Sequence, residues 1–106
     1  MLLGLGSDGH TASIFPDRTE LFSSTRLFEV AVKPGTVEKR ITATGRLINN
    51  SSKVFFIVTG KEKAKIVSEI VEKKTGSERY PASKVDPESG HMVWMLDSPA
   101  ASLLKI

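Results

Sequence analysis

Apolar residues occur along the chain in short runs that predict strands. The run at residues 53–59 is apolar at almost every position and rich in β-branched and aromatic side chains, which is typical of a central parallel strand covered by helices on both faces. Runs at residues 27–32 and 92–96 predict two more strands, and residues 40–44 predict a short extended piece. Residues 1–3 run straight into glycines, as at the carboxyl end of a buried strand.

Apolar residues recur with a helical period at residues 61–75. Lysines and glutamates fill the other positions, and Gly76 follows where a helix would end. Residues 11–15, which are closed by a proline, predict one or two helical turns. Residues 100–104 predict a terminal helix, because Ser98 before a proline resembles an N-cap with proline at the first helical position.

Strands that alternate with helices predict a layered architecture. We expect an α/β, Rossmann-like layered fold with a mostly parallel sheet and right-handed crossovers. A chain of 106 residues that is 40% hydrophobic can bury one core of ordinary size. Residues 1–106 are therefore expected to form a single domain.

Composition narrows the classes of function. The chain has no cysteine, so it offers neither a disulfide nor a thiolate metal site, which fits a reducing compartment. Its net charge is +3, and its lysines are interspersed with glutamates instead of forming the basic stripe of a nucleic-acid binder. No run approaches the roughly 18 uninterrupted apolar residues of a membrane helix. We expect a small anionic ligand, with no nucleic acid, membrane or metal.

The turn after residues 1–3 carries the main candidate chemistry. Residues 4–9 read Gly-Leu-Gly-Ser-Asp-Gly and satisfy the G-x-G-x-x-G pattern of dinucleotide sites. That pattern needs a full strand before it, a full helix after it and an acid at the end of the next strand. Glu29 has the spacing but lies within a predicted strand. Dinucleotide binding is therefore the weaker interpretation.

Asp8 and His10 give the stronger interpretation of the same turn. They follow the carboxyl end of a strand, which is the edge at which open α/β sheets bind ligands. Glycine permits positive φ and a close approach of substrate, and an imidazole beside a carboxylate can be oriented and made a better base. The residues alone leave an alternative open, in which Asp8 caps a following helix and His10 is a polar residue in its first turn.

Lys63 is a candidate phosphate ligand. A cation in the first turn of a helix opposes the helix dipole at a cost of up to about 1 kcal/mol unless an anion also binds there. The loop at Thr59 and Gly60 ends the central strand and is expected to expose free backbone N–H groups at that helix start. The alternative is a solvated lysine among the five lysines of that helix.

The segment LGLGSDGHTASIFP at residues 3–16 resembles the signature of the 6-phosphogluconolactonases, which share a fold with the glucosamine-6-phosphate deaminases. The resemblance continues at residues 40–42, 58–64, 81–83, 94–97 and 100–101 and so covers nearly the whole chain. It implies a cofactor-free hydrolase that converts 6-phosphoglucono-δ-lactone to 6-phosphogluconate in the oxidative pentose phosphate pathway.

The resemblance also implies roles for individual residues. His10 would take a proton from water, and Asp8 would orient or electrostatically support His10. The glycines would leave room for the sugar ring, and a guanidinium and an ammonium would hold the phosphate. The implied substrate-binding residues are Gly4, Gly6, Gly9, Arg40 and Lys63.

Phe15 bears on the choice within this superfamily. The deaminase branch places a glutamate five residues after the histidine to assist ring opening and proton shuttling. Phe15 holds that position here. This favours lactone hydrolysis, and a deaminase-like reaction stays as an alternative.

Family members are considerably longer, and the chain resembles only their carboxyl-terminal half. A lone half would expose a sheet edge and apolar faces, so we expect a second chain that supplies the missing amino-terminal half. The sequence leaves three explanations open: a truncated product, one chain of a processed enzyme, or a catalytically inactive module for sugar-phosphate binding or assembly. A cytoplasmic location is expected.

Overall fold

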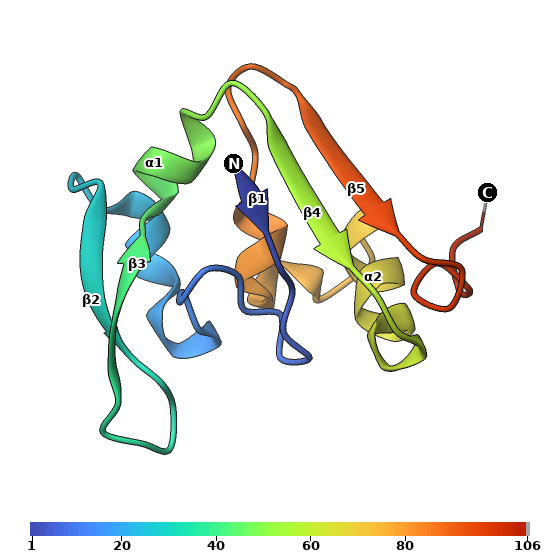
Figure 1. Ribbon diagram of the computed structural model, residues 1–106, viewed down its shortest axis with the longest axis horizontal. Coiled ribbons are helices and arrows are strands. Elements are labelled where there is room, and N and C mark those ends of the chain that lie inside the picture. Colours follow the sequence, from blue (N-terminus) through green and yellow to red (C-terminus); the bar gives the residue numbers. More distant parts are fainter. Residues whose placement is uncertain (106) are drawn as a thin grey trace.

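The computed structural model describes residues 1–105 and contains a three-stranded sheet and a separate hairpin (Figure 1). The sheet has the order β1–β4–β5, and its strands are all parallel. β1 is Leu2–Leu3, β4 is Val54–Val58 and β5 is Met92–Leu96. The central position of β4 and the parallel pairing confirm the predicted α/β class.

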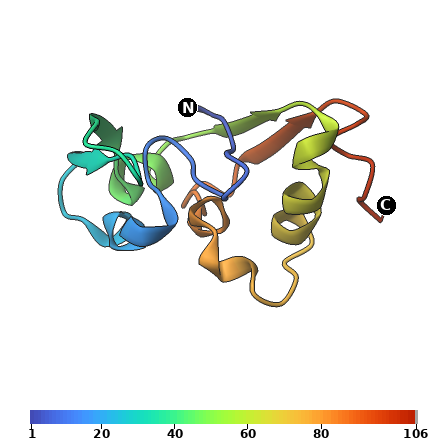
Figure 2. The same cartoon turned by 90° about the horizontal axis from the view of Figure 1, so that it is seen from below.

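The connection from β4 to β5 covers one face of the sheet (Figure 2). It contains α2 (Ala64–Val71), which is amphipathic as predicted. The apolar side of α2 packs on the inner residues of β4, and the buried residues of this contact are Val54, Phe56, Val58, Ile66, Val67 and Ile70. Phe56 also stacks on Trp94 of β5, with ring centroids 4.1 Å apart and 8° between the planes. Burial of these side chains holds helix and sheet together.

The opposite face of the sheet carries no helix among residues 1–105 (Figure 2). Its apolar side chains come from all three strands, and we call this surface the bare face: Leu2, Phe55, Ile57, Val93 and Met95. Leu2 is 69% exposed and Ile57 is 47% exposed. The prediction that helices cover the central strand on both sides is therefore wrong for the described residues. Right-handed crossovers that step in one direction across a sheet place their connections on one face.

β2 (Phe28–Val32) and β3 (Lys39–Ala43) form an antiparallel hairpin outside the sheet. Both strands were predicted, at residues 27–32 and 40–44, and the observed bounds differ from these by no more than one residue at either end. Their short connecting loop turns at Gly35, which has φ of 77°, and a loop of this length can join only antiparallel neighbours. The helix α1 (Gly45–Asn49) follows. It was not predicted, because five residues are too few to show a helical period.

Residues 11–15 do not form the predicted helical turns. Thr11 and Ile14 close a tight turn in which the N–H of Ile14 donates to the carbonyl of Thr11 over 2.9 Å. The 3-10 helix η1 begins after this turn and spans Pro16–Ser23. Proline suits the first position of a helix because that position needs no N–H donor. Pro16 therefore begins a helix that the prediction took it to end.

Lys73, and not Gly76, provides the left-handed residue that ends α2. Lys73 has φ of 50°, and its N–H donates to the carbonyl of Ile70 over 3.2 Å. The next N–H, of Lys74, donates to the carbonyl of Glu69 over 2.9 Å. This pair of bonds is a Schellman motif. The helix is therefore shorter than predicted at its carboxyl end.

Three short 3-10 helices complete the crossover from β4 to β5. They are η2 (Lys61–Lys63), η3 (Ser77–Arg79) and η4 (Pro81–Lys84). Gly76 precedes η3 in a left-handed conformation with φ of 87°. None of the helices among residues 1–105 is long and apolar enough to cross a membrane.

The predicted terminal helix at residues 100–104 is a set of turns. The cap is Asp97 and not Ser98, because the Asp97 carboxylate accepts the N–H of Ala100 over 2.9 Å. The same carboxylate accepts the N–H of Gly60 at 3.1 and 3.2 Å. Asp97 is thus committed to holding two loops together.

Candidate functional site

The chain leaves β1 through a tight turn that positions Asp8 and His10. The N–H of Gly6 donates to the carbonyl of His10 over 2.9 Å, and the N–H of Gly9 donates to the carbonyl of Gly6 over 3.0 Å. Gly9 has φ of 86°, which favours glycine. At Gly6 an added Cβ would overlap the imidazole of His10. Gly4 has open space around its Cα.

Asp8 holds His10 by two contacts. Its Oδ1 lies 2.6 Å from Nδ1 of the imidazole and accepts the backbone N–H of His10 over 3.0 Å. Partial burial raises the pKa of Asp8, but the hydrogen bonds and positive charge that His10 supplies outweigh it and leave the pKa below its ordinary value. The carboxylate is therefore ionised at neutral pH. With Nδ1 engaged, Nε2 is the ring nitrogen left for water or substrate.

The alternative roles of these two residues find no support in the structure. Asp8 bonds to His10 and not to a helix start, because residues 11–15 are not helical. The same fact removes the helix that would hold a pyrophosphate in a dinucleotide site. Glu29, the residue with the right spacing for a ribose contact, accepts a hydrogen bond from Ser24 over 2.8 Å.

Residues outside the turn hold it in place, and no pattern in the sequence identifies them. Thr11 Oγ1 donates to the carbonyl of Gly4 over 2.8 Å. Phe15 is 3% exposed and its ring lies 4.7 Å from that of His10. Behind the turn, the N–H of Ala82 donates to the carbonyl of Gly9 over 3.0 Å, and the ring of Tyr80 fills the space beside Gly9. These supporting roles become visible only in the three-dimensional structure, because the residues are brought together by the fold.

Lys63 reaches the same site from η2. A pocket of about 540 Å³ has His10, Lys63, Gly4 and Gly6 among its lining residues. The ammonium of Lys63 donates to the carbonyl of Leu5. Lys63 is thus directed into the turn, and the interpretation as one solvated lysine among several does not describe it.

The loop before Lys63 differs from its prediction in one respect. The N–H of Gly60 was expected to be free for an anion. It donates instead to the carboxylate of Asp97. The candidate phosphate site therefore depends on the Lys63 ammonium and not on the Gly60 amide.

Arg40, Asp8 and Gly9 do not line this pocket. Arg40 lies in β3, and its guanidinium pairs with Glu38, with Nη2 2.8 Å from the carboxylate. Asp8 and Gly9 belong to the turn that borders the pocket. The structure therefore brings His10 and Lys63 together and leaves Arg40 in a separate ion pair.

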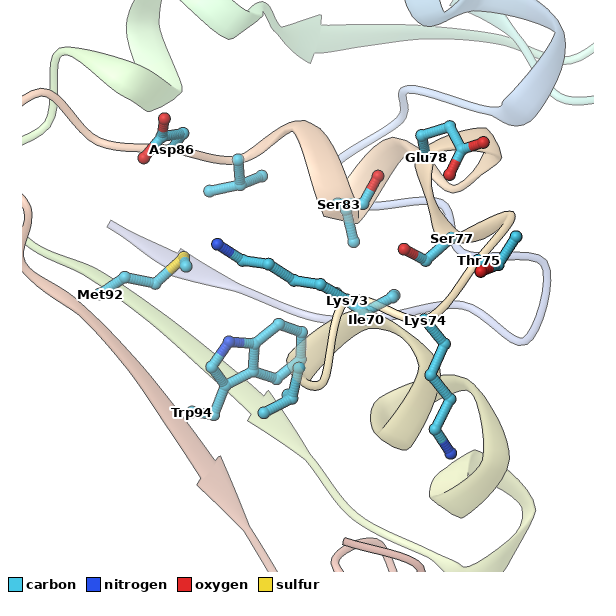
Figure 3. Close-up of a pocket in the computed structure, with 13 residues that line it drawn as sticks. Ile70, Lys73, Lys74, Thr75, Ser77, Glu78, Ser83, Asp86, Met92 and Trp94 are labelled. Carbon is cyan, nitrogen blue, oxygen red and sulfur yellow. The ribbon is translucent and has the colours of Figure 1, made fainter. Parts of the chain in front are cut away.

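Two further features of the described residues concern metal binding and a second pocket. Among residues 1–105 no three His, Cys, Asp or Glu side chains are grouped so as to hold a metal ion. A second pocket, of about 660 Å³, lies at the carboxyl end of α2 and contains neither His10 nor Lys63 (Figure 3). It is larger than the pocket at His10, but it contains no histidine and its lining includes no residue of the turn at residues 4–10.

A family model described as glucosamine-6-phosphate isomerases/6-phosphogluconolactonase matches residues 1–94. The chain belongs to this family. A 6-phosphogluconolactonase of Aggregatibacter actinomycetemcomitans in the same family is 38% identical over 104 residues, which are 98% of this chain and 44% of that protein.

Solved structures agree with this family assignment. The devB protein superposes with a TM-score of 0.86 at 39% identity, over 95% of this chain and 42% of that one. A 6-phosphogluconolactonase from Leishmania guyanensis superposes with a TM-score of 0.80 at 27% identity, over 99% and 41%. The chain therefore spans less than half the length of these family members. Which half it matches stays a prediction.

Proposed function

We propose that the protein hydrolyses 6-phosphoglucono-δ-lactone to 6-phosphogluconate, a carboxylic ester hydrolysis of the oxidative pentose phosphate pathway that needs no cofactor. The observation that carries this proposal is the Asp8–His10 contact of 2.6 Å at the border of a glycine-lined pocket that also contains Lys63. The relatives named 6-phosphogluconolactonase supply the substrate class.

The proposed reaction begins with His10. Nε2 takes a proton from a water molecule, and the resulting hydroxide attacks the lactone carbonyl carbon to form a C–O bond. The tetrahedral intermediate then collapses, the bond from that carbon to the ring oxygen breaks, and the imidazolium returns its proton to the ring oxygen. Atoms and charge balance, because the water supplies the O–H of the new carboxyl group and the proton of the new hydroxyl group, and the carboxylic acid then releases its proton to solvent.

Asp8 and the glycines support this step in different ways. The Asp8 carboxylate fixes the ring orientation and stabilises the imidazolium that forms. Gly6 leaves the imidazole its space, and Gly4 keeps the pocket open beside it. Gly9 permits the left-handed turn that places the two functional residues together.

Lys63 is the proposed ligand of the substrate phosphate. Its ammonium is already aimed into the turn by the carbonyl of Leu5, and a dianionic phosphate is a stronger acceptor than a neutral carbonyl. Arg40 stays a second proposed phosphate ligand, and to take that part it must leave Glu38.

The decisive experiment compares lactone hydrolysis by the protein and by His10→Ala, each corrected for the spontaneous rate. A general base contributes about 10²- to 10⁴-fold, so the enzymatic rate should fall by at least about 100-fold. His91→Ala is the matched control, because His91 lies at the opposite end of the sheet, next to β5. An unchanged rate in His10→Ala would refute the assignment.

Two alternatives make different predictions in the same assay. A deaminase-like enzyme would release ammonia from glucosamine 6-phosphate, but Phe15, 3% exposed, stands where that branch has its glutamate. A catalytically inactive module would bind 6-phosphogluconate without turnover. Ammonia release and isothermal titration with 6-phosphogluconate distinguish these cases.

A second chain is part of the proposal. The bare face exposes apolar side chains on a parallel sheet, and such sheets are normally covered on both faces. We infer that polypeptide corresponding to the remaining length of the family members covers it. A cytoplasmic location belongs to the same proposal, because a chain without cysteine suits a reducing compartment.

A further inference from the structure

The pocket at the carboxyl end of α2 is built like a ligand site. Its volume of about 660 Å³ lies within the range of small-molecule pockets, roughly 300 to 1,000 Å³. The apolar part of its lining includes Ile70, Val85 and Trp94 (Figure 3). One face of the Trp94 indole is already stacked on Phe56, which fixes the ring as a rigid wall.

Lys73 supplies a charge to this pocket. Its backbone occupies the left-handed position of the helix end, where glycine is favoured, yet the chain has a lysine there. The side chain extends across the pocket past Trp94 (Figure 3). Among residues 1–105 no carboxylate forms an ion pair with the Lys73 ammonium, so it is free to receive an anion.

Ser77 supplies a second polar group. The residue is only 8% exposed and it lines the pocket. A serine hydroxyl on the wall of a pocket can donate a hydrogen bond to an anion. Lys74 does not compete for this role, because its ammonium lies 3.5 Å from the carboxylate of Glu72.

Two acidic residues on the lining restrict the charge of the ligand. Glu78 and Asp86 both border the pocket, and like charges disfavour a multiply charged anion. A single negative charge suits one free ammonium and one hydroxyl, and the apolar walls suit a ring.

We propose that this pocket binds a small carboxylic acid with an apolar ring, whose carboxylate contacts Lys73 and Ser77 and whose ring lies against Trp94 and Val85. The site is separate from the one at His10 and does not depend on the proposed lactone hydrolysis.

The chain contains a built-in reporter for this test. Trp94 is its one tryptophan, so intrinsic fluorescence reports on the pocket wall. The probes are cyclohexanecarboxylate, its neutral analogue cyclohexanecarboxamide and the cation cyclohexylammonium, which have nearly the same shape. A saturable change in Trp94 emission is expected with the carboxylate, with an affinity at least about 10-fold tighter than that of the amide, because hydrogen bonds to charged groups are the stronger ones.

Variants decide which residue holds the carboxylate. Lys73→Gln should weaken binding about 10-fold and Ser77→Ala about 3-fold, whereas Lys73→Arg should retain the affinity within about 3-fold. Lys65→Gln, on the exposed side of α2, is the matched control and should bind like the parent. Circular dichroism checks that each variant is folded.

Three results would overturn the proposal. They are the absence of a saturable signal with the carboxylate, equal binding of carboxylate and amide, and an unchanged affinity in a folded Lys73→Gln. His10→Ala should bind cyclohexanecarboxylate like the parent, so failure of the lactonase assignment leaves this test intact.

Discussion

Asp8 acts on His10 from two directions, through the ring nitrogen and through the backbone N–H. The contact to the backbone fixes where the side chain starts, and the contact to Nδ1 fixes how the ring is turned. Both contacts use Oδ1 of a carboxylate whose lowered pKa keeps it ionised at neutral pH. The position and ring orientation of His10 thus depend on one neighbouring residue.

Asp8→Asn tests this dependence in the proposed reaction. The amide no longer stabilises the imidazolium, so we expect kcat to fall by about 100-fold or more with little change in KM. Steady-state lactone hydrolysis measures both values. Asp17→Asn, an exposed carboxylate at the start of η1, should behave like the parent. A variant with the parental kcat would remove Asp8 from the mechanism.

The same residue links stability to pH. Because the folded-state pKa of Asp8 is lowered below the ordinary 3.8, its contribution to stability is present above that value and is lost as pH falls through the folded pKa. The side chain is 47% exposed, so the contribution is small. The difference in Tm between the parent and Asp8→Asn should therefore narrow below about pH 3.8. A difference that widens in acid would contradict this sign.

Gly6 and Gly4 form a natural pair of test positions. A Cβ at Gly6 would overlap the imidazole of His10, whereas a Cβ at Gly4 would meet nothing within 4 Å. Gly6→Ala should lower kcat/KM about 100-fold by displacing the imidazole, since small displacements at a reacting group can cost that much. Gly4→Ala should leave kcat within about 3-fold because its Cβ does not reach His10, and should raise KM because Gly4 lines the pocket. Equal effects of the two substitutions would show that the overlap is relieved elsewhere.

At the scale of single residues, contacts could be predicted from the sequence where the two residues are close together in the chain. Asp8 and His10 are two positions apart, so their contact could be anticipated. Tyr80, which packs against Gly9, comes from a distant segment, and no local pattern announces it. The position of Arg40 away from the pocket reflects its contact with Glu38, two residues before it on the same strand.

At the scale of elements, the strands were easier to predict than the helices. A strand shows itself through a run of apolar or β-branched residues, and all five strands were anticipated. Helix ends depend instead on single contacts. Asp97 caps the last turns from a position before the expected cap, and Pro16 begins a helix.

The end of α2 yields a stability prediction. A residue other than glycine in the left-handed conformation costs about 1 kcal/mol, so Lys73→Gly should raise the free energy of unfolding by about 0.5–1 kcal/mol. Urea titration measures the change. Lys65→Gly, in the first turn of the same helix, should lower it by up to about 1 kcal/mol. A loss of stability in Lys73→Gly would mean that the lysine side chain itself contributes to packing.

At the scale of the whole molecule, helices cover only one face of the three-stranded sheet among residues 1–105. The bare face presents Leu2, Ile57 and Met95 at 69%, 47% and 52% exposure in adjacent strands. Contiguous apolar surface of this kind marks an interaction site or an aggregation hazard. The predicted covering of both faces failed here because it assumed polypeptide that the described residues do not include.

The bare face predicts how the protein associates in solution. We expect the 11.6 kDa protein to bind a hydrophobic dye and to self-associate at micromolar concentration. Ile57→Lys combined with Met95→Lys should reduce both dye binding and apparent mass, since both residues are about half exposed already. Val37→Lys, a change at a 94% exposed residue of the hairpin loop, is the control. A monomeric parent that binds no dye would contradict the inference that this face needs a partner.

The strand order β1–β4–β5 has a consequence for how the protein is made. The turn with Asp8 and His10 leaves β1, and the strand with which β1 pairs among residues 1–105 is β4, at Phe55 and Phe56. During synthesis on the ribosome β1 cannot form this pair until β4 has emerged, because pairing of distant segments cannot begin before both exist. The turn that carries Asp8 and His10 is therefore translated before the strand that supports β1.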